Sequence, residues 1–285
     1  MSVLVTGATG FLGNLVIEQL LNDGIEVVAT SRSKEKAQLF QWYSKVTYIP
    51  FDINSTTHFQ GNLFHHFHSP TQLIHLAWEG LPNYNALSHF ETNLYSSYYF
   101  LKRLIGEGLS DLTITGTCLE YGMQEGCLSE TTPTNPSNPY AIAKDTLCKM
   151  LQTISLSNTI NLKWLRLFYM YGKGQAPTSL FSQLETAIAR NDNTFNMSGG
   201  EQTRDFLPVE KVVEIIVQLT FLNTNAGVVN CCSGKPQKVK DFVTQMINER
   251  SSSIKLNLGY YPYTSYEPMC FWGDTTKLNT LLLSR

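Results

Sequence analysis

A tyrosine and a lysine four residues apart, Tyr140 and Lys144, have the spacing in this 285-residue chain that most directly suggests chemistry. On a helix, residues four apart lie on one face, so the phenol and the ammonium are neighbours. A free phenol has a pKa of about 10 and gives up its proton too reluctantly at neutral pH, whereas a nearby ammonium favours the phenolate. The pair therefore predicts an acid–base group in which Lys144 lowers the pKa of Tyr140 towards the working range.

A glycine-rich turn near the start of the chain predicts a dinucleotide site. The run Thr6-Gly7-Ala8-Thr9-Gly10-Phe11-Leu12-Gly13 follows the apolar segment Val3–Val5 and precedes residues with helical spacing. Gly7 permits the tight turn, Gly10 lets the backbone approach a pyrophosphate, and Gly13 lets helix and strand pack closely. The N-terminus of the helix then offers unpaired N–H groups and a partial positive charge to the phosphates.

The Gly-x-x-Gly-x-x-Gly spacing, together with Tyr-x-x-x-Lys, resembles the extended short-chain dehydrogenase/reductase superfamily. This is a superfamily of NAD(P)-dependent sugar-nucleotide epimerases, dehydratases and reductases. Thr117 stands four residues before a Tyr-Gly pair at the end of a predicted strand, which is the catalytic hydroxyl position of the family. The resemblance implies that Tyr140 protonates a substrate carbonyl oxygen, that Thr117 polarises it, and that Lys144 also grips the cofactor ribose.

Short apolar segments that alternate with helical ones predict an α/β fold, a Rossmann doubly wound parallel sheet with a smaller C-terminal α/β substrate-binding part. We expect residues 1–168 and 207–232 in the NAD(P)-binding domain, and residues 169–206 and 233–285 in the substrate-binding part. The strands that we expect are Val3–Val5, Glu26–Ala29, Val46–Ile49, Gln72–Trp78, Leu112–Thr115, Leu162–Phe168 and Val228–Cys231.

The end of the second predicted strand bears on the choice of dinucleotide. NAD enzymes usually carry an acid there, which accepts from the adenosine ribose, but this chain has Arg32. A guanidinium can hold a 2′-phosphate with a fork of donors, so we expect NADP(H) rather than NAD(H); an ordinary solvated charge is the alternative. The resemblance implies that further residues also contact the cofactor: Thr9, Phe11, Leu12, Asp52, Ile53, Leu76, Ala77, Trp78 and Tyr140.

The resemblance also implies a set of substrate-binding residues. Arg204, within an Arg-Asp-Phe segment, is expected to grip the nucleotide diphosphate by bidentate hydrogen bonds, with a purely structural arginine as the alternative. Tyr169 stands where the family has an asparagine that touches the sugar nucleotide, and this departure suggests an altered pocket. The complete set that we expect is Trp78, Thr117, Cys118, Tyr140, Tyr169 and Arg204.

Three reactions compete within this superfamily. A dehydratase would need an Asp-Glu pair directly after Thr117, where Cys118 and Leu119 stand, and strand alternation predicts that Glu120 faces elsewhere. A 4-epimerase usually has the acidic end of the second strand that is missing here. We therefore expect NADP-dependent reduction of a nucleotide-activated 4-keto-6-deoxyhexose in deoxysugar or surface polysaccharide biosynthesis. An NAD-dependent 4-epimerase is the first alternative, and a non-catalytic NADP-binding sensor the second.

Composition limits the other partners. The 21 basic and 23 acidic residues give a formal net charge of −2, so the chain has no excess of positive charge that would attract nucleic acid. There is no apolar stretch of transmembrane length and no signal peptide, so we expect no membrane contact and a cytoplasmic location. The six cysteines lack metal-ligand spacing, so we expect reduced thiols and no metal. The resemblance implies a homodimer formed through long helices at Asn93–Ile105 and Tyr140–Leu156.

Overall fold

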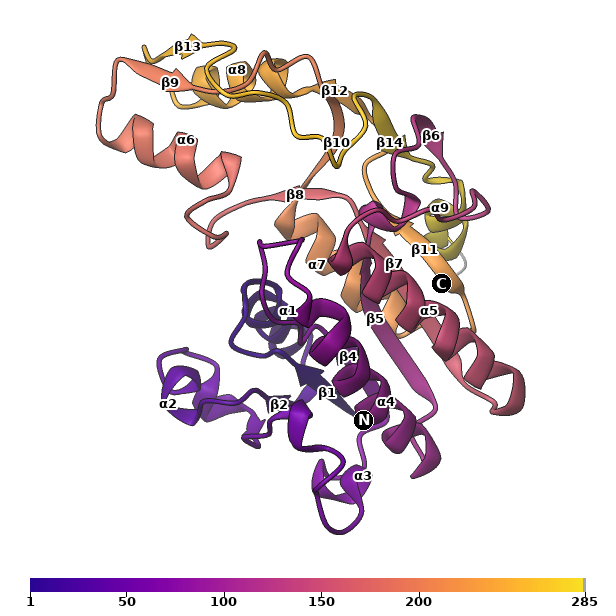
Figure 1. The fold of residues 1–285 in the computed structure, drawn as a ribbon. Coiled ribbons are helices and arrows are strands. Elements are labelled where there is room, and N and C mark those ends of the chain that lie inside the picture. Colours follow the sequence, from indigo (N-terminus) through magenta and orange to yellow (C-terminus); the bar gives the residue numbers. More distant parts are fainter. Residues whose placement is uncertain (284–285) are drawn as a thin grey trace.

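Seven parallel strands form the central sheet of the computed structural model, which describes residues 1–283 (Figure 1). Their order is β11-β7-β5-β4-β1-β2-β3, so the chain changes direction between β1 and β4, where a crevice opens at the carboxyl ends. The predicted doubly wound Rossmann sheet is thus confirmed, with β3 shorter than expected. The strands are β1 (Ser2–Thr6), β2 (Glu26–Thr30), β3 (Thr47–Tyr48), β4 (Gln72–His75), β5 (Asp111–Thr117), β7 (Asn161–Leu167) and β11 (Gly227–Cys231).

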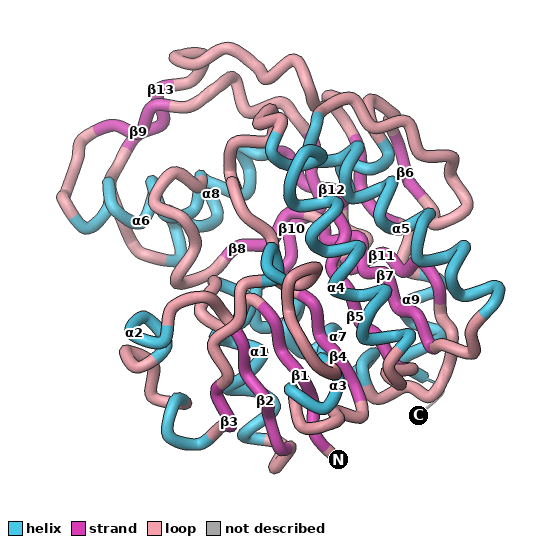
Figure 2. Tube along the Cα trace, turned by 60° about the horizontal axis from the view of Figure 1, so that its bottom comes forward, coloured by secondary structure: helices cyan, strands magenta, loops and turns pink. Residues whose placement is uncertain are grey.

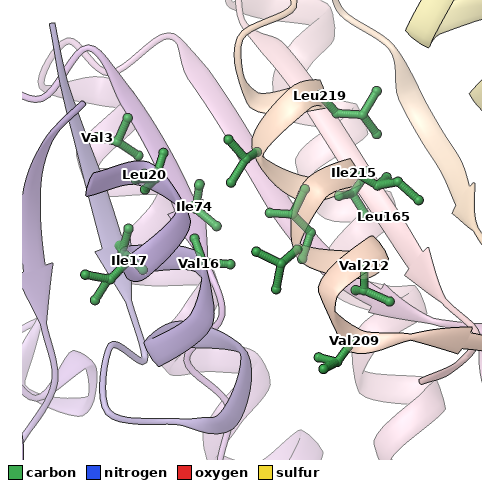
Figure 3. Close-up of a cluster of buried hydrophobic side chains, with 14 of the residues drawn as sticks. Val3, Val16, Ile17, Leu20, Ile74, Leu165, Val209, Val212, Ile215 and Leu219 are labelled. Carbon is green, nitrogen blue, oxygen red and sulfur yellow. The ribbon is translucent and has the colours of Figure 1, made fainter. Parts of the chain in front are cut away.

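Helices cover both faces of this sheet. Helix α1 (Phe11–Asn22) packs against α7 (Val209–Thr220) on one face, and α4 (Leu94–Gly106) packs against α5 (Pro139–Ser157) on the other. Figure 3 shows the first of these layers, in which Val16 and Leu20 of α1 lie over the sheet beside α7. Such residues recur every three or four positions, and burying each large side chain contributes about 1.5–3 kcal/mol.

Short elements connect these layers. They include a π-helical segment, η3, which leads directly into α4, and a 3-10 helix, η4, which follows β5 without a break. The short helical elements are α2 (Lys34–Ala37), η1 (Tyr43–Lys45), η2 (Ile53–Ser55), α3 (Leu63–His66), η3 (His89–Asn93) and η4 (Cys118–Tyr121).

A smaller α/β part lies beyond the carboxyl ends of the strands, and it has its own core. Figure 2 shows α6, α8, β9 and β13 together at one end of the molecule. The rings of Phe206 and Phe242 stack at 4.1 Å between their centroids and join β10 to α8. The elements are β6 (Gly126–Leu128), β8 (Tyr169–Tyr171), α6 (Leu180–Ala189), β9 (Thr194–Asn196), β10 (Thr203–Pro208), β12 (Pro236–Lys238), α8 (Val239–Glu249), β13 (Lys255–Asn257) and β14 (Phe271–Gly273). The last helix, α9 (Thr276–Leu283), packs instead against β11 and α7 of the central sheet layer.

The domain boundaries that we expect stay a prediction. The expected substrate-binding part ends with residues 284 and 285, which lie outside the described part of the chain. No helix within residues 1–283 is both long enough and apolar enough to cross a membrane.

Candidate active site

The glycine turn between β1 and α1 packs closely against neighbouring backbone, as its sequence predicts. Gly7 has a φ of +68°, and a Cβ there would lie 2.8 Å from the backbone nitrogen of Ala77. A Cβ on Gly13 would overlap the carbonyl oxygen of Gly7, so helix and turn are in direct backbone contact. Gly10 is the N-cap of α1, and no side chain caps the helix there. The first N–H groups of a twelve-residue helix are therefore free to receive a phosphate.

We expect Gly13→Ala to lower the free energy of unfolding by about 1–3 kcal/mol, because the added methyl group must push the turn away from α1. Urea denaturation measures this change, and calorimetric titration with NAD+ measures the accompanying loss of affinity. Gly106→Ala, near the end of α4, is the matched control, because a Cβ there meets no atom within 4 Å. Equal stability of the two variants would contradict the close contact.

A cleft of about 300 Å³ opens beside this turn at the carboxyl ends of β1, β2 and β4. It fits an adenine dinucleotide, because it combines the glycine turn with a buried hydroxyl, Thr30 Oγ1, that has no hydrogen-bond partner among residues 1–283. Nine residues that we predicted to bind the cofactor line the cleft: Gly7, Thr9, Gly10, Arg32, Asp52, Ile53, Leu76, Ala77 and Trp78.

Five other predicted cofactor residues lie outside the lining of this cleft, and their contact with a dinucleotide stays a prediction. Phe11, Leu12 and Gly13 belong to the first turn of α1. Tyr140 and Lys144 lie on α5, and both contact the indole of Trp78.

Arg32 does not present a free cation to this cleft. Its Nη1 lies 2.7 Å from Oε1 of Glu79, and both residues line the cleft. The carboxylate neutralises the guanidinium and would repel a 2′-phosphate. Glu79 follows β4, so an acid is present near the end of β2 although the sequence of β2 itself contains none. The sequence analysis did not identify Glu79 as part of the site. The one indication in the sequence was that this acidic residue directly follows Trp78.

Helix α5 begins so that Tyr140 and Lys144 share a buried face. The side chain of Asn138 accepts a hydrogen bond from the backbone N–H of Ala141 at 2.9 Å and caps the helix. The backbone N–H of Tyr140 donates to the carbonyl oxygen of Tyr84, at 3.1 Å. Tyr140 is 8% exposed and Lys144 only 2%. The start of the helix is thus fixed both by its cap and by the segment that follows β4.

The ammonium of Lys144 makes its hydrogen bond and its cation–π contact with groups other than the phenol that it was predicted to activate. Its Nζ donates to the carbonyl oxygen of Thr115 at 2.8 Å and lies 4.0 Å from the centre of the Trp78 ring. Burial lowers the pKa of Lys144 to about 7, and the charge of Glu120 opposes this shift. The cation–π contact and one carbonyl oxygen are the neighbours that replace water around the charge.

The predicted lowering of the pKa of Tyr140 is wrong for this structure. Burial raises the pKa of the phenol, and the nearby Tyr84 and Glu120 raise it further. A hydrogen bond with the side chain of Thr117, which is 7% exposed, acts in the opposite direction. Because desolvation outweighs every favourable contact, the phenol keeps its proton, which suits an acid rather than a base.

Trp78 joins the dinucleotide cleft to this buried group. Its indole N–H donates to Nδ1 of His89 at 3.0 Å, and the rings of Trp78 and Tyr140 pack in a T shape with 6.0 Å between their centres. His89 is fully buried, and its Nε2 lies 2.7 Å from the carbonyl oxygen of Asn83. The predicted site residue Trp78 therefore contacts both the cleft and the Tyr140–Lys144 pair, whereas His89 carried no signal in the sequence.

On the substrate side, the structure favours the structural interpretation of Arg204. This residue is 3% exposed, and its Nη2 lies 3.0 Å from Oε2 of Glu267. Its Nη1 donates to the carbonyl oxygen of Thr203 at 2.9 Å, and its guanidinium lies 4.9 Å from the centre of the Phe271 ring. A carboxylate therefore already pairs with the guanidinium in this structure, and the expected contact of Arg204 with a nucleotide diphosphate stays a prediction.

Cys118 and Tyr169, the other predicted substrate residues, lie close to this ion pair. Cys118 is 5% exposed, and burial raises the pKa of its thiol. Tyr169 lies with its ring 5.4 Å from the guanidinium of Arg204, and burial raises the pKa of its phenol. Neither group is ionised near neutral pH. The described residues contain no cluster of His, Cys, Asp or Glu that would hold a metal ion.

Comparisons with known proteins show the family of this chain. Residues 3–232 match the model of the NAD dependent epimerase/dehydratase family. A dTDP-6-deoxy-L-talose 4-dehydrogenase (NAD(+)) of Aggregatibacter actinomycetemcomitans is 31% identical over 274 residues, which cover 96% of this chain and 99% of that protein. A GDP-6-deoxy-D-talose 4-dehydrogenase of the same organism is 24% identical over 288 residues, which cover 99% of this chain and 91% of that protein.

A solved structure extends the likeness to the whole fold. The UDP-glucuronic acid 4-epimerase of Bacillus cereus, in complex with UDP-glucuronic acid and NAD, superposes with a TM-score of 0.85 at 23% identity. The match covers 100% of this chain and 94% of that one.

These findings overturn the expectation of NADP(H). The dTDP-6-deoxy-L-talose relative is named for NAD(+), and the superposed epimerase holds NAD. The physical reason lies in the Arg32–Glu79 ion pair, which removes the free cation on which the expectation rested. The extent of the family match, the sheet and the glycine turn together show that this chain is an enzyme of the NAD-dependent epimerase/dehydratase family, within the extended short-chain dehydrogenase/reductase superfamily.

Proposed function

We propose that this enzyme is an NAD(H)-linked sugar-nucleotide 4-reductase, which reduces the ketone of a nucleotide-activated 4-keto-6-deoxyhexose. The observation that carries the proposal is the contact of Trp78 with both the dinucleotide cleft and the Tyr140–Lys144 pair. The 31% identical relative supports it, because its name gives a dTDP-linked 6-deoxyhexose, position 4 and NAD(+). Oxidation at C4 is the reverse of the reduction that we propose.

Each member of the buried group has one role in this proposal. The dinucleotide, when bound along the glycine turn, supplies the hydride that C4 receives. Tyr140, which keeps its proton in this buried position, gives that proton to the C4 oxygen as the hydride arrives. Thr117 donates a hydrogen bond to the same oxygen as negative charge develops on it. Lys144 supplies positive charge to the buried group that contains Tyr140.

A substrate panel tests the proposal. Purified enzyme should oxidise NADH when it is given dTDP- or GDP-linked 4-keto-6-deoxyhexoses, and the product should carry a new C4 hydroxyl by NMR. The 4-epimerase alternative predicts instead tightly held NAD+ and exchange of the C4 configuration without net consumption of NADH. NADH binding without turnover of any 4-keto sugar nucleotide would contradict the reductase and favour a sensor.

A further inference from the structure

A buried ion pair lies directly behind Thr117. Glu120 is fully buried, and its Oε2 lies 2.7 Å from Nε of Arg166, which is 4% exposed. Its Oε1 accepts the backbone N–H of Thr117 at 2.8 Å, and the indole N–H of Trp164 lies 3.1 and 3.2 Å from the two oxygens. A buried ion pair is weak evidence for stability, because desolvation offsets much of its attraction. Its position therefore calls for another explanation.

We propose that Glu120 is a positioning residue for the reaction, which fixes Thr117 through its backbone N–H and supplies a buried negative charge for the ammonium of Lys144. Because it assumes that Thr117 and Lys144 act at the substrate, this assignment rests on the proposed function. Strand alternation predicted that the Glu120 side chain faces away from the site. That prediction fails because β5 ends at Thr117 and the chain turns into η4, which brings the Glu120 carboxylate back to the end of the strand.

The first half of the assignment rests on a reciprocal cap. The Thr117 hydroxyl accepts the backbone N–H of Leu119 at 3.3 Å, while the Glu120 carboxylate accepts the backbone N–H of Thr117. A Cβ on Gly116 would overlap the Glu120 carboxylate and the Trp164 indole, so glycine is the residue that admits them. Both the backbone and the side chain of Thr117 are thus held where the hydroxyl meets Tyr140.

The second half rests on the charges around Lys144. On β4, His75 is buried, and desolvation lowers its pKa to about 3, so it carries no charge near neutral pH. On α5, Tyr140 keeps its proton. On β7, Arg166 is paired with Glu120. Burial raises the pKa of Glu120 itself, but the guanidinium of Arg166, 2.7 Å away, opposes this shift and favours the carboxylate. The negative charge of that carboxylate raises the pKa of Lys144 against the effect of burial.

Glu120→Gln tests the assignment, because it keeps an oxygen for the N–H of Thr117 and removes the charge. We expect kcat of the reduction to fall on the order of 10- to 100-fold, with little change in KM for the sugar nucleotide. Activity should be lost at lower pH than in the wild type, because Lys144 loses its proton more readily. The 13Cε resonance of Lys144, followed by NMR with 13C-labelled lysine, should shift its titration to lower pH in the same way.

A conservative variant separates the two halves and remains informative if the glutamine variant folds poorly. Glu120→Asp keeps the charge but shortens the side chain, so the carboxylate no longer reaches the N–H of Thr117. We expect kcat to fall while the Lys144 titration stays close to that of the wild type.

Asp111→Asn is the matched control. Asp111 forms a buried ion pair with Lys163, at 2.7 Å, that joins β5 and β7 at the end away from Thr117. This variant should lower the melting temperature but leave kcat, the pH profile and the Lys144 resonance unchanged. If both Glu120 variants only lower the melting temperature, the assignment is overturned. The NMR titration needs no substrate, so an unchanged Lys144 refutes the charge role even where the proposed reaction itself is not observed.

Discussion

Replacing Tyr140 with phenylalanine is expected to lower kcat for reduction of a 4-keto sugar nucleotide by roughly 10²–10⁴-fold, the usual contribution of a positioned acid. The phenol is 8% exposed, and its hydroxyl makes a hydrogen bond with Thr117. No water has ready access to replace it as a proton donor. Because the lost atom is one oxygen, the ring still packs against Trp78 and Tyr84, and NAD+ affinity should stay close to that of the wild type.

Steady-state NADH oxidation and calorimetric titration with NAD+ measure these two quantities. Tyr99→Phe, which removes a hydroxyl from a 45% exposed tyrosine on α4, is the control and should behave as wild type. A Tyr140→Phe enzyme with wild-type turnover would refute the proposed acid. A similar loss in Thr117→Val would support a shared role of the two hydroxyls at one oxygen.

Lys144→Met is expected to lower kcat on the order of 10²-fold, because it removes positive charge from a site shielded from water. In the wild type, activity should decline as pH rises through about 7, where Lys144 loses its proton. The variant should lack this decline and remain low throughout. A pH–rate profile between pH 5.5 and 9 measures the difference, and a wild-type profile that is flat across that range would contradict the role of the charge.

The same variant should also change how stability depends on pH. The pKa of Lys144 is about 7 in the folded protein, against about 10.4 in an unfolded chain. Between these values only the unfolded chain holds the proton, so the free energy of unfolding of the wild type rises with pH by up to about 1.4 kcal/mol per unit. Relative to the wild type, Lys144→Met should therefore be most stabilised below pH 7, and this advantage should shrink towards pH 10.

Urea denaturation at a series of pH values measures this slope. Lys102→Met, at an exposed position on α4, is the control and should keep the wild-type pH dependence. Parallel stability curves for Lys144→Met and the wild type would mean that the ammonium is better solvated than its burial implies.

The sequence patterns predicted the fold better than the site. All seven sheet strands were expected, because buried parallel strands are short apolar runs with turns and helices between them. The glycine turn was equally readable, since backbone contacts at Gly7 and Gly13 exclude a side chain whatever surrounds them. Both signals are local, so a single sequence contains them.

The errors concern side chains whose partners are distant in sequence. Arg32 pairs with Glu79 from the loop after β4, and Arg204 pairs with Glu267 from the C-terminal segment. Helical spacing correctly placed Lys144 on the face of Tyr140. It did not predict where the ammonium points, because Trp78 and Thr115 determine that. Tertiary contacts of this kind decide charge and pKa, and no periodicity reveals them.

The Arg32–Glu79 pair separates the charge at the rim of the dinucleotide cleft from the rest of the enzyme. Its two side chains, 59% and 42% exposed, belong neither to the core of the sheet nor to the buried Tyr140 group. We therefore expect that substitutions at this rim can change the affinity for a 2′-phosphate while the framework and the proton-transfer residues keep their structure.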